Sequence, residues 1–208
     1  MRLPCWLLFL FALPGMALAG GFKHVDHKHW TNKYDQHFRK NSKHYFGPTV
    51  NWRWFKAQGI AKSGLDPHAR SKAGAVGIMQ IMPSTFKEIR EKNPTVMNLE
   101  DLKWNIAAGI FYDRYLYDKW EFLDTDERQR LFFAFGSYNA GFRRVRQAYN
   151  KSVKKHKTVR EWSQVAPFVP KASSYYVDAG HSLMNTPLLW LIAAWLILLF
   201  IPCWQAWR

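Results

Sequence analysis

Apolar residues recur at helical spacing along most of the chain, and no alternating apolar–polar stretch is long enough to predict a sheet. Segments 34–45, 52–63 and 99–121 all show this period. In the last of them, Leu102, Ile106 and Ile110 fall on one face of the predicted helix, and that face would be buried. The pattern therefore predicts a mainly α fold.

Breaks in the pattern predict where the helices end and begin. Gly64 follows segment 52–63 at the position of a helix C-cap. Asp66 and Pro67 then offer an N-cap residue followed by proline at the first helical position. A second helix is expected to start at this point, directly after a sharp turn.

Two further breaks divide the middle of the chain. Gly74 and Gly77 precede the apolar group 78–83, which predicts a loop whose backbone comes close to another segment or to a ligand. Asp124 and Glu127 have the spacing of a capping box, and they predict the start of another helix.

The first 19 residues read as a secretory signal peptide. Arg2 supplies the positive start, residues 7–11 form an apolar run, and residues 17–19 (Ala-Leu-Ala) resemble a cleavage site. An uncleaved N-terminal anchor is the other reading, but Pro14 and Gly15 interrupt the short apolar stretch. Either reading predicts that the chain is exported.

The C-terminal end predicts a single transmembrane helix over residues 187–208. Residues 188–204 form a run without a charge, close to the lower limit of about 17 apolar residues that a bilayer requires. A buried C-terminal helix is less consistent with the pattern, because the run has no polar face. The folded domain, residues 34–186, would thus be membrane-anchored, in the periplasm or on the outer side of the cytoplasmic membrane.

A polar, histidine-rich lead-in covers residues 20–33. His27 and His29 with Asp26 could begin a metal site, but nothing nearby completes a ligand shell. A solvated arm is therefore expected. We expect no metal and no cofactor.

The charge balance predicts an anionic partner. The chain carries 30 Lys and Arg against 15 Asp and Glu in 208 residues, a net charge of +15. Basic residues are densest in segment 143–160, which has no acid, and this run is either a solvated helix face or a surface that contacts a polyanion. Nucleic acid is not expected as the partner, because the chain is predicted to be exported.

Several ordered motifs resemble the soluble lytic transglycosylase (SLT) family, which has the lysozyme-like fold. The resemblance covers residues 34–181 and is carried by these elements: Ser63, Gly74-Ala75, Gly77-Ile78-Met79-Gln80, Met82-Pro83, Thr85, Asn105-Ile106 with Gly109, Ser137-Tyr138-Asn139-Ala140-Gly141 and Tyr176-Val177. It implies a mainly α, lysozyme-like domain that binds the glycan strands of peptidoglycan. The substrate groove would include Ser63, Met79, Gln80, Tyr138, Asn139 and Tyr176.

Lys62 departs from the family pattern. The family carries its single catalytic glutamate immediately before the serine, and this chain has Lys62 there. In the enzymes that it resembles, that carboxyl protonates the glycosidic oxygen between N-acetylmuramic acid and N-acetylglucosamine and then deprotonates the muramyl 6-hydroxyl, which yields a 1,6-anhydro sugar. Lysine starts from a pKa of about 10.4, and its cation repels the positive charge that develops on the sugar. Little or no turnover is expected.

Neighbouring carboxyls do not offer a clear replacement. Gly64 and Pro67 separate Asp66 from the helix of Lys62, Glu88 reads as an exposed helix residue, and Glu161 is remote from the motif. Three functions remain open. The chain is a membrane-tethered lytic transglycosylase impaired at Lys62, a non-catalytic peptidoglycan-binding pseudoenzyme, or a holin-like or scaffold protein centred on its C-terminal span. The third is the least consistent with the sequence, because the groove motif is nearly complete.

Overall fold

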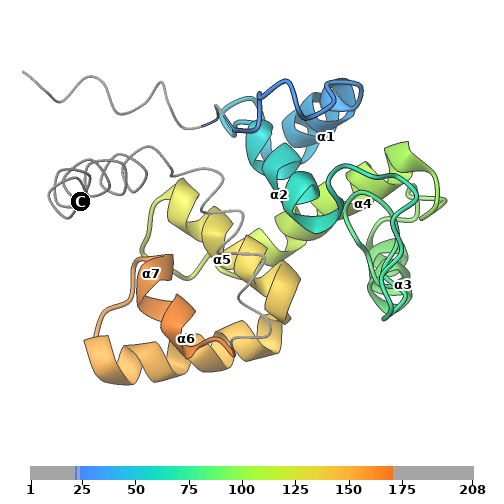
Figure 1. Ribbon diagram of the computed structural model, residues 1–208. Coiled ribbons are helices and arrows are strands. Elements are labelled where there is room, and N and C mark those ends of the chain that lie inside the picture. The colour runs from blue at the N-terminus through green and yellow to red at the C-terminus, as the bar shows by residue number, and fades with distance from the viewer. Residues whose placement is uncertain (1–21, 23, 171–208) are drawn as a thin grey trace, which may run out of the picture.

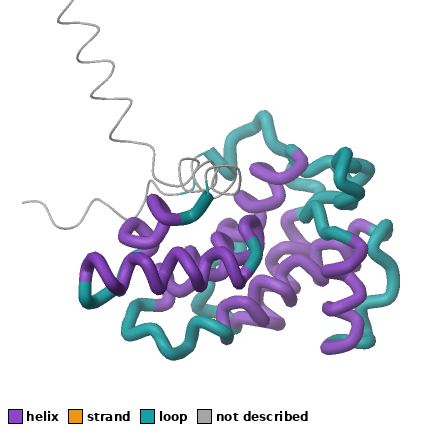
Figure 2. The backbone as a smooth tube through the Cα atoms, turned by 90° about the horizontal axis from the view of Figure 1, so that it is seen from below, coloured by secondary structure: helices purple, strands orange, loops and turns teal. Residues whose placement is uncertain are grey.

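Helices joined by loops make up the computed structural model, which describes Phe22 and residues 24–170 (Figures 1 and 2). The elements are α1 (Asp35–Phe46), α2 (Arg53–Ser63), α3 (Pro83–Lys92), α4 (Leu102–Asp118), α5 (Glu127–Ala140), α6 (Phe142–His156), α7 (Trp162–Val165) and the 3-10 helix η1 (Ala166–Phe168). The predicted signal peptide, Tyr176 and the predicted transmembrane segment lie outside the described residues. Within the described residues, no helix is long and apolar enough to cross a membrane.

Helix α4 is the centre of the fold. It packs against α1 on one side and α5 on the other, so that it lies between the α1–α2 pair and the group α5–α7 (Figure 1). Ile106 and Ile110 of the predicted face are fully buried, and Leu102, at the start of the helix, is partly buried. Asp101 caps the start of α4, because its side chain accepts hydrogen bonds from the backbone N–H groups of Lys103 and Trp104.

Helix α2 ends where the sequence predicts. Gly64 adopts the left-handed conformation (φ 65°) and its N–H donates to the carbonyl of Ile60, as in a helix C-cap. Gly59 lies one turn earlier, and a Cβ there would come within 3.1–3.2 Å of Ile78, Leu65 and Phe38. The last turn of α2, which carries Lys62 and Ser63, is therefore held close against the loop that follows it.

The helix predicted to start at Asp66–Pro67 does not form. The Oδ1 atom of Asp66 accepts a hydrogen bond from the backbone N–H of His68 (2.8 Å), which closes a local turn. An aspartate that satisfies a backbone donor in this way competes with helix formation. The chain then forms two isolated antiparallel bridges, from Val76 to Arg70 and to Ile81.

The capping residue of α5 also differs from the prediction. Asp126, not Asp124, precedes the helix, and its Oδ1 atom accepts from the N–H of Gln129 (2.7 Å). Asp124 pairs with Arg160 instead, at 2.5 Å. The two aspartates lie two residues apart, and the spacing alone did not distinguish between them.

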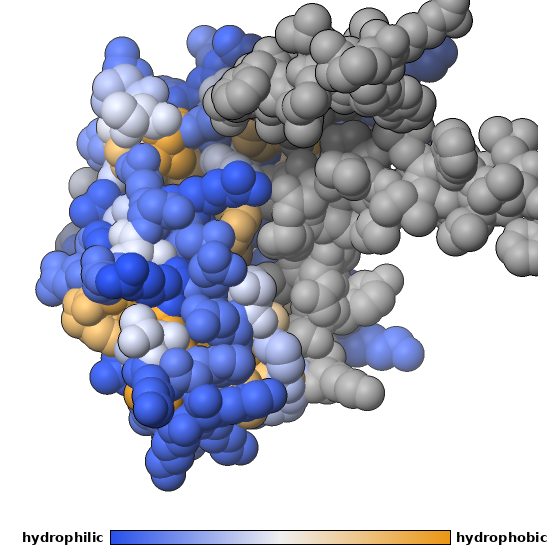
Figure 3. All heavy atoms as spheres, turned by 90° about the vertical axis from the view of Figure 1, so that its left-hand side faces the viewer, coloured by the Kyte–Doolittle hydropathy of each residue, from blue (hydrophilic) through white to orange (hydrophobic). Residues whose placement is uncertain are grey.

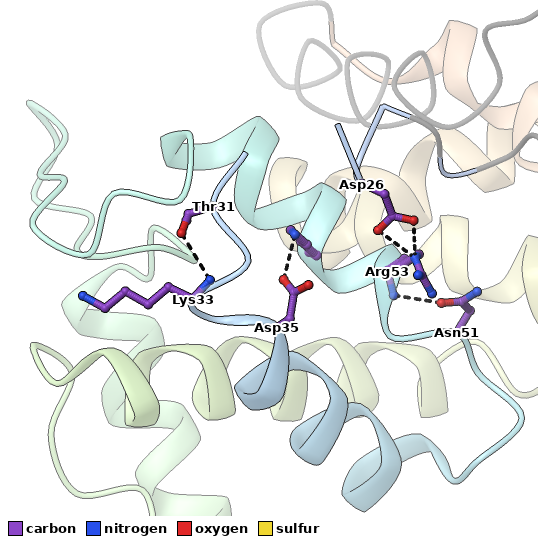
Figure 4. Close-up of polar contacts among 7 residues, drawn as sticks. Asp26, Thr31, Lys33, Asp35, Asn51 and Arg53 are labelled. Atoms are coloured by element: carbon purple, nitrogen blue, oxygen red, sulfur yellow. Dashed lines mark hydrogen bonds and ion pairs between the residues drawn. The ribbon is translucent and has the colours of Figure 1, made fainter. Parts of the chain in front are cut away.

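The lead-in packs against α2 and is only partly the solvated arm that was expected. Its histidines His24, His27 and His29 are exposed, but Val25 is buried in the core. Asp26 pairs with Arg53 at the start of α2, at 2.7 Å (Figure 4). The lead-in therefore forms part of the folded unit.

Helix α6 carries the basic run on its exposed side. Val145, Ala148 and Ser152 form its buried stripe, whereas most of its Lys and Arg residues are exposed. The side of the molecule on which α6 and α7 lie is mostly hydrophilic, with scattered hydrophobic residues (Figure 3). This helix therefore presents a cationic surface.

A buried ion pair joins α1 to α2 and gives a stability prediction. Lys56 Nζ lies 2.7 Å from Asp35 Oδ1, and the two side chains are only 3% and 19% exposed. Asp35→Asn leaves the Lys56 ammonium buried without its counter-charge, so a loss of about 3 kcal/mol is expected in urea unfolding. The matched control is Asp26→Asn, which breaks the more exposed pair with Arg53 and should cost less than about 1 kcal/mol. Equal losses in the two variants would refute this distinction.

Candidate active site

A buried asparagine holds the loop that follows α2. Asn105 on α4 accepts a hydrogen bond from the Met79 N–H (2.8 Å) and donates to the carbonyls of Val76 and Leu99 (both 3.0 Å). One side chain therefore satisfies three backbone groups of irregular segments. The loop is positioned by α4 and not only by its own turns.

Gly77 allows Asn105 to approach the loop. Its φ of +73° is rarely adopted by residues with a side chain, and a Cβ at this position would lie 2.5 Å from Asn105 Nδ2. The close backbone approach predicted from the two glycines is thus confirmed at Gly77, and the segment approached is α4.

Lys62 lies in the last turn of α2 and faces α5. Its Nζ atom donates a hydrogen bond to Asn139 Oδ1 at 2.5 Å and lies 4.7 Å from the centroid of the Tyr138 ring. Burial lowers the pKa of Lys62 to about 8, and the negative charge of Asp113 opposes this effect. The structure therefore brings Lys62, Tyr138 and Asn139 together, as the motifs suggested.

Ser63 and Met79 connect the last turn of α2 to the loop. The Ser63 hydroxyl donates to the carbonyl of Ile78 at 2.9 Å. The Met79 side chain is fully buried, and its atoms would meet a Cβ at Gly109 within 2.7–2.8 Å. The Met79 carbonyl accepts from the Tyr138 hydroxyl at 3.0 Å. These two residues thus brace the site, and the part of Met79 that meets Tyr138 is its backbone.

Gln80 has a similar bracing role. It adopts a positive φ of 48°, and its Nε2 atom donates to the carbonyls of Ala69 (3.1 Å) and Gly77 (3.0 Å). Its amide donors are therefore used within the loop. Tyr176, the remaining predicted groove residue, lies outside the described residues.

Asp113 is a site residue that the sequence reading missed. It is fully buried on α4, and its Oδ1 atom accepts from Gln58 Nε2 at 3.1 Å. In the described part of the chain, its Oδ2 atom has no hydrogen-bond partner. Burial raises the pKa of Asp113 well above its usual value, while Gln58 and Lys62 act in the opposite direction. The sequence held one signal for Asp113. It lies three positions after the apolar Ile110, so helical spacing places this charged residue on the buried side of α4.

Other carboxyls are placed differently around the site. Glu88 is not simply exposed, as predicted, because it is partly buried and interacts with the Tyr112 hydroxyl. The Tyr112 ring in turn contacts the Tyr138 ring, with centroids 5.5 Å apart. Asp66 closes its local turn and Glu161 caps α7, so neither is directed at Lys62.

No group of three or more His, Cys, Asp or Glu side chains suited to a metal ion occurs among the described residues.

The site can bind polar groups but differs from an acid catalyst. The ammonium of Lys62 can donate hydrogen bonds, and one of its donors is directed to Asn139. The nearest fully buried carboxyl, Asp113, has no access to solvent. The arrangement therefore places a hydrogen-bond-donating cation over the ring of Tyr138, which packs on the ring of Tyr112.

Comparisons with known proteins agree with this picture. The chain is 30% identical over 133 residues to the membrane-bound lytic murein transglycosylase F of Desulfosudis oleivorans, covering 63% of this chain and 28% of that protein. It is 29% identical over 141 residues to the protein of the same name from Pseudomonas fluorescens, covering 68% and 27%. The chain thus spans little more than a quarter of the length of these relatives.

A solved structure supports the fold. The 70 kDa soluble lytic transglycosylase of Escherichia coli superimposes with a TM-score of 0.56 at 22% identity, over 73% of this chain and 24% of that chain. The model of the transglycosylase SLT domain matches residues 47–160, which contain α2 to α6 and every described residue of the site. The chain therefore belongs to the transglycosylase SLT domain family, in the lysozyme-like superfamily.

Proposed function

We propose that this protein binds peptidoglycan glycan strands as a lytic murein transglycosylase does, and that Lys62 takes the place of the catalytic glutamate and leaves it with little or no turnover. The observation that carries the proposal is the position of the Lys62 ammonium. It lies at the end of α2, 2.5 Å from Asn139 Oδ1 and over the ring of Tyr138, two of the residues that the family resemblance assigns to the groove.

The chemistry of the reaction explains the expected loss. One group must give a proton to the glycosidic oxygen and then remove one from the 6-hydroxyl. With a pKa of about 8, Lys62 is mostly protonated at pH 7, so it is poorly prepared to act as the base. Its positive charge also opposes the oxocarbenium-like charge of the transition state. Both effects act against turnover, whereas neither prevents saccharide binding.

Binding and cleavage can be tested separately. The full chain in mild detergent should sediment with purified sacculi at about 0.3 M salt, where the Debye length falls well below 10 Å and non-specific attraction of a basic protein is reduced. Tyr138→Ala removes the ring beneath Lys62 and the hydrogen bond to Met79, and it should weaken this sedimentation. Binding that is lost entirely at this salt concentration would contradict a groove-based interaction.

A non-catalytic peptidoglycan-binding protein is the second candidate. The cationic surface of α6 and the net charge of +15 favour it, since both would hold an anionic wall polymer without chemistry. The two candidates differ in whether anhydro-muropeptides are released. An impaired enzyme releases them slowly, whereas a non-catalytic binding protein releases none at any protein concentration.

Export and membrane tethering complete the proposal. The signal-like residues 1–19 and the uncharged run 188–204 support it, as do the relatives, which are named membrane-bound. Deleting residues 187–208 is expected to move the protein from the membrane fraction to the soluble fraction, with sacculus binding unchanged. Cell fractionation followed by sedimentation with sacculi checks both parts. A truncated protein that stays in the membrane fraction would contradict the tether.

A further inference from the structure

A buried carboxyl lies beside the lysine of the site, and the proposed reaction does not use it. Asp113 is fully buried on α4, so it cannot reach a substrate. A buried carboxylate is costly unless a cation or hydrogen-bond donors compensate it. Gln58 supplies one donor to Oδ1, and in the described part of the chain Oδ2 receives none. The residue therefore needs a further source of compensation.

The helix geometry places Lys62 in position to supply it. Gln58 and Lys62 lie four residues apart on α2, so their side chains are neighbours on one helix face. Gln58 contacts Asp113 directly. From the other side, the Lys62 ammonium lies over Tyr138, whose ring packs on Tyr112, the residue adjacent to Asp113. The helix spacing, the hydrogen bond of Gln58 and the ring contact of Tyr138 all place Lys62 near Asp113, and the two charges interact electrostatically.

We infer that Asp113 is the buried counter-charge of Lys62, and that Gln58, Lys62 and Asp113 form one unit that fits this site to a cation at residue 62. Each charge lowers the cost of burying the other. The inference deepens the proposed function, because it concerns the same groove residue, but its test reads the lysine itself and does not require turnover.

The pairing with Asp113 affects which charge is favourable at position 62. A lysine alone at this partly buried position would lose solvation without a compensating charge, whereas this chain supplies the negative charge of Asp113 for it. A glutamate at position 62 would instead face a second carboxyl, and the two would share a proton. Asp113 is thus a positioning residue that acts through residue 62.

The test measures the ionisation of Lys62 in the full chain, in mild detergent. Competitive acetylation with acetic anhydride between pH 6 and 11, read by peptide mass spectrometry, gives the apparent pKa of each lysine. Among the described residues, the groups that face Lys62 include Asp113 from α4 and Tyr138 with Asn139 from α5. Tyr112, which interacts with Glu88, packs on the Tyr138 ring. Of these, only Asp113 is changed.

In Asp113→Asn, the acetylation profile of Lys62 should move to lower pH by about one unit, because a nearby anion that favoured the ammonium has been removed. The matched control is Asp118→Asn on the same helix, whose carboxylate is half-exposed and pairs with Arg114. It should leave the Lys62 profile unchanged. An unchanged profile in Asp113→Asn, or equal shifts in both variants, would overturn the inference.

A second measurement covers the case in which Asp113→Asn folds poorly. Lys62→Met, Asp113→Leu and the double variant Lys62→Met/Asp113→Leu are compared by thermal melting. If the two charges compensate each other, the double variant should lose less melting temperature than the sum of the two single losses. Losses that add would contradict the pairing. Neither measurement depends on the protein having any glycan-cleaving activity.

Discussion

Lys62→Glu is expected to raise the release of 1,6-anhydro-muropeptides from sacculi by about 10²–10⁴-fold over the unchanged chain, the range that general acid–base assistance contributes. The remaining parts of the site are in place. The loop is held by Asn105 and Gly77, and the Tyr138 hydroxyl is fixed to the Met79 carbonyl. A glutamate in the last turn of α2 would lie beside the same aromatic ring, where partial burial raises its pKa toward the value that the reaction requires.

The control for this prediction is Lys62→Gln, which has similar length and polarity but no titratable group. It should remain inactive, so an equal gain in both variants would show that removal of the cation, and not the new acid, is responsible.

The pH dependence of the Lys62→Glu activity offers a further check. Asp113 beside Glu at position 62 raises the pKa of the new acid, so adding Asp113→Asn should lower it. The decline of activity at high pH should then begin at a lower pH than in Lys62→Glu alone.

Asn105→Ala is expected to destabilise the protein by at least about 3 kcal/mol, because it leaves one buried N–H and two carbonyls without their partner, each at a cost of about 1–3 kcal/mol. The backbone groups concerned belong to Met79, Val76 and Leu99. Urea unfolding measures the loss. Sacculus binding should fall as well, because the loop beside Lys62 loses its attachment to α4.

Asn150→Ala is the matched control for that substitution. Asn150 is exposed on α6, so its truncation should change the free energy of unfolding by less than about 0.5 kcal/mol. If Asn105→Ala were as mild as Asn150→Ala, the loop would have to be held by other contacts, and the account of the site would need revision.

The helices were predictable where a local signal and the apolar period agreed. Gly64 ends α2 as expected, and Ile106 and Ile110 mark the buried face of α4. The prediction failed where one signal stood alone. Asp66 followed by Pro67 resembles a helix start, but its side chain closes a turn. A cap is decided by which side chain reaches a free N–H, and spacing alone cannot decide this.

The candidate site was predictable only in part, because its members come from separate helices. Motifs suggested Lys62, Tyr138 and Asn139, and the structure brings them together. Asp113 could not be assigned from the sequence, since its partners lie on α2, more than 50 positions away. The inward direction of its side chain follows from how α4 packs between α1 and α5, and that packing is a property of the whole fold.

Muropeptide mass spectrometry on sacculi incubated with the unchanged full chain shows whether a protein with Lys62 cleaves glycan strands. We expect the chain to sediment with the sacculi and anhydro-muropeptides to stay at the level of the Lys62→Gln control. Release of anhydro-muropeptides at a rate comparable to that of Lys62→Glu would refute the proposed loss of turnover. In that case Lys62 would be compatible with catalysis, and the proton transfers would have to be assigned to another group.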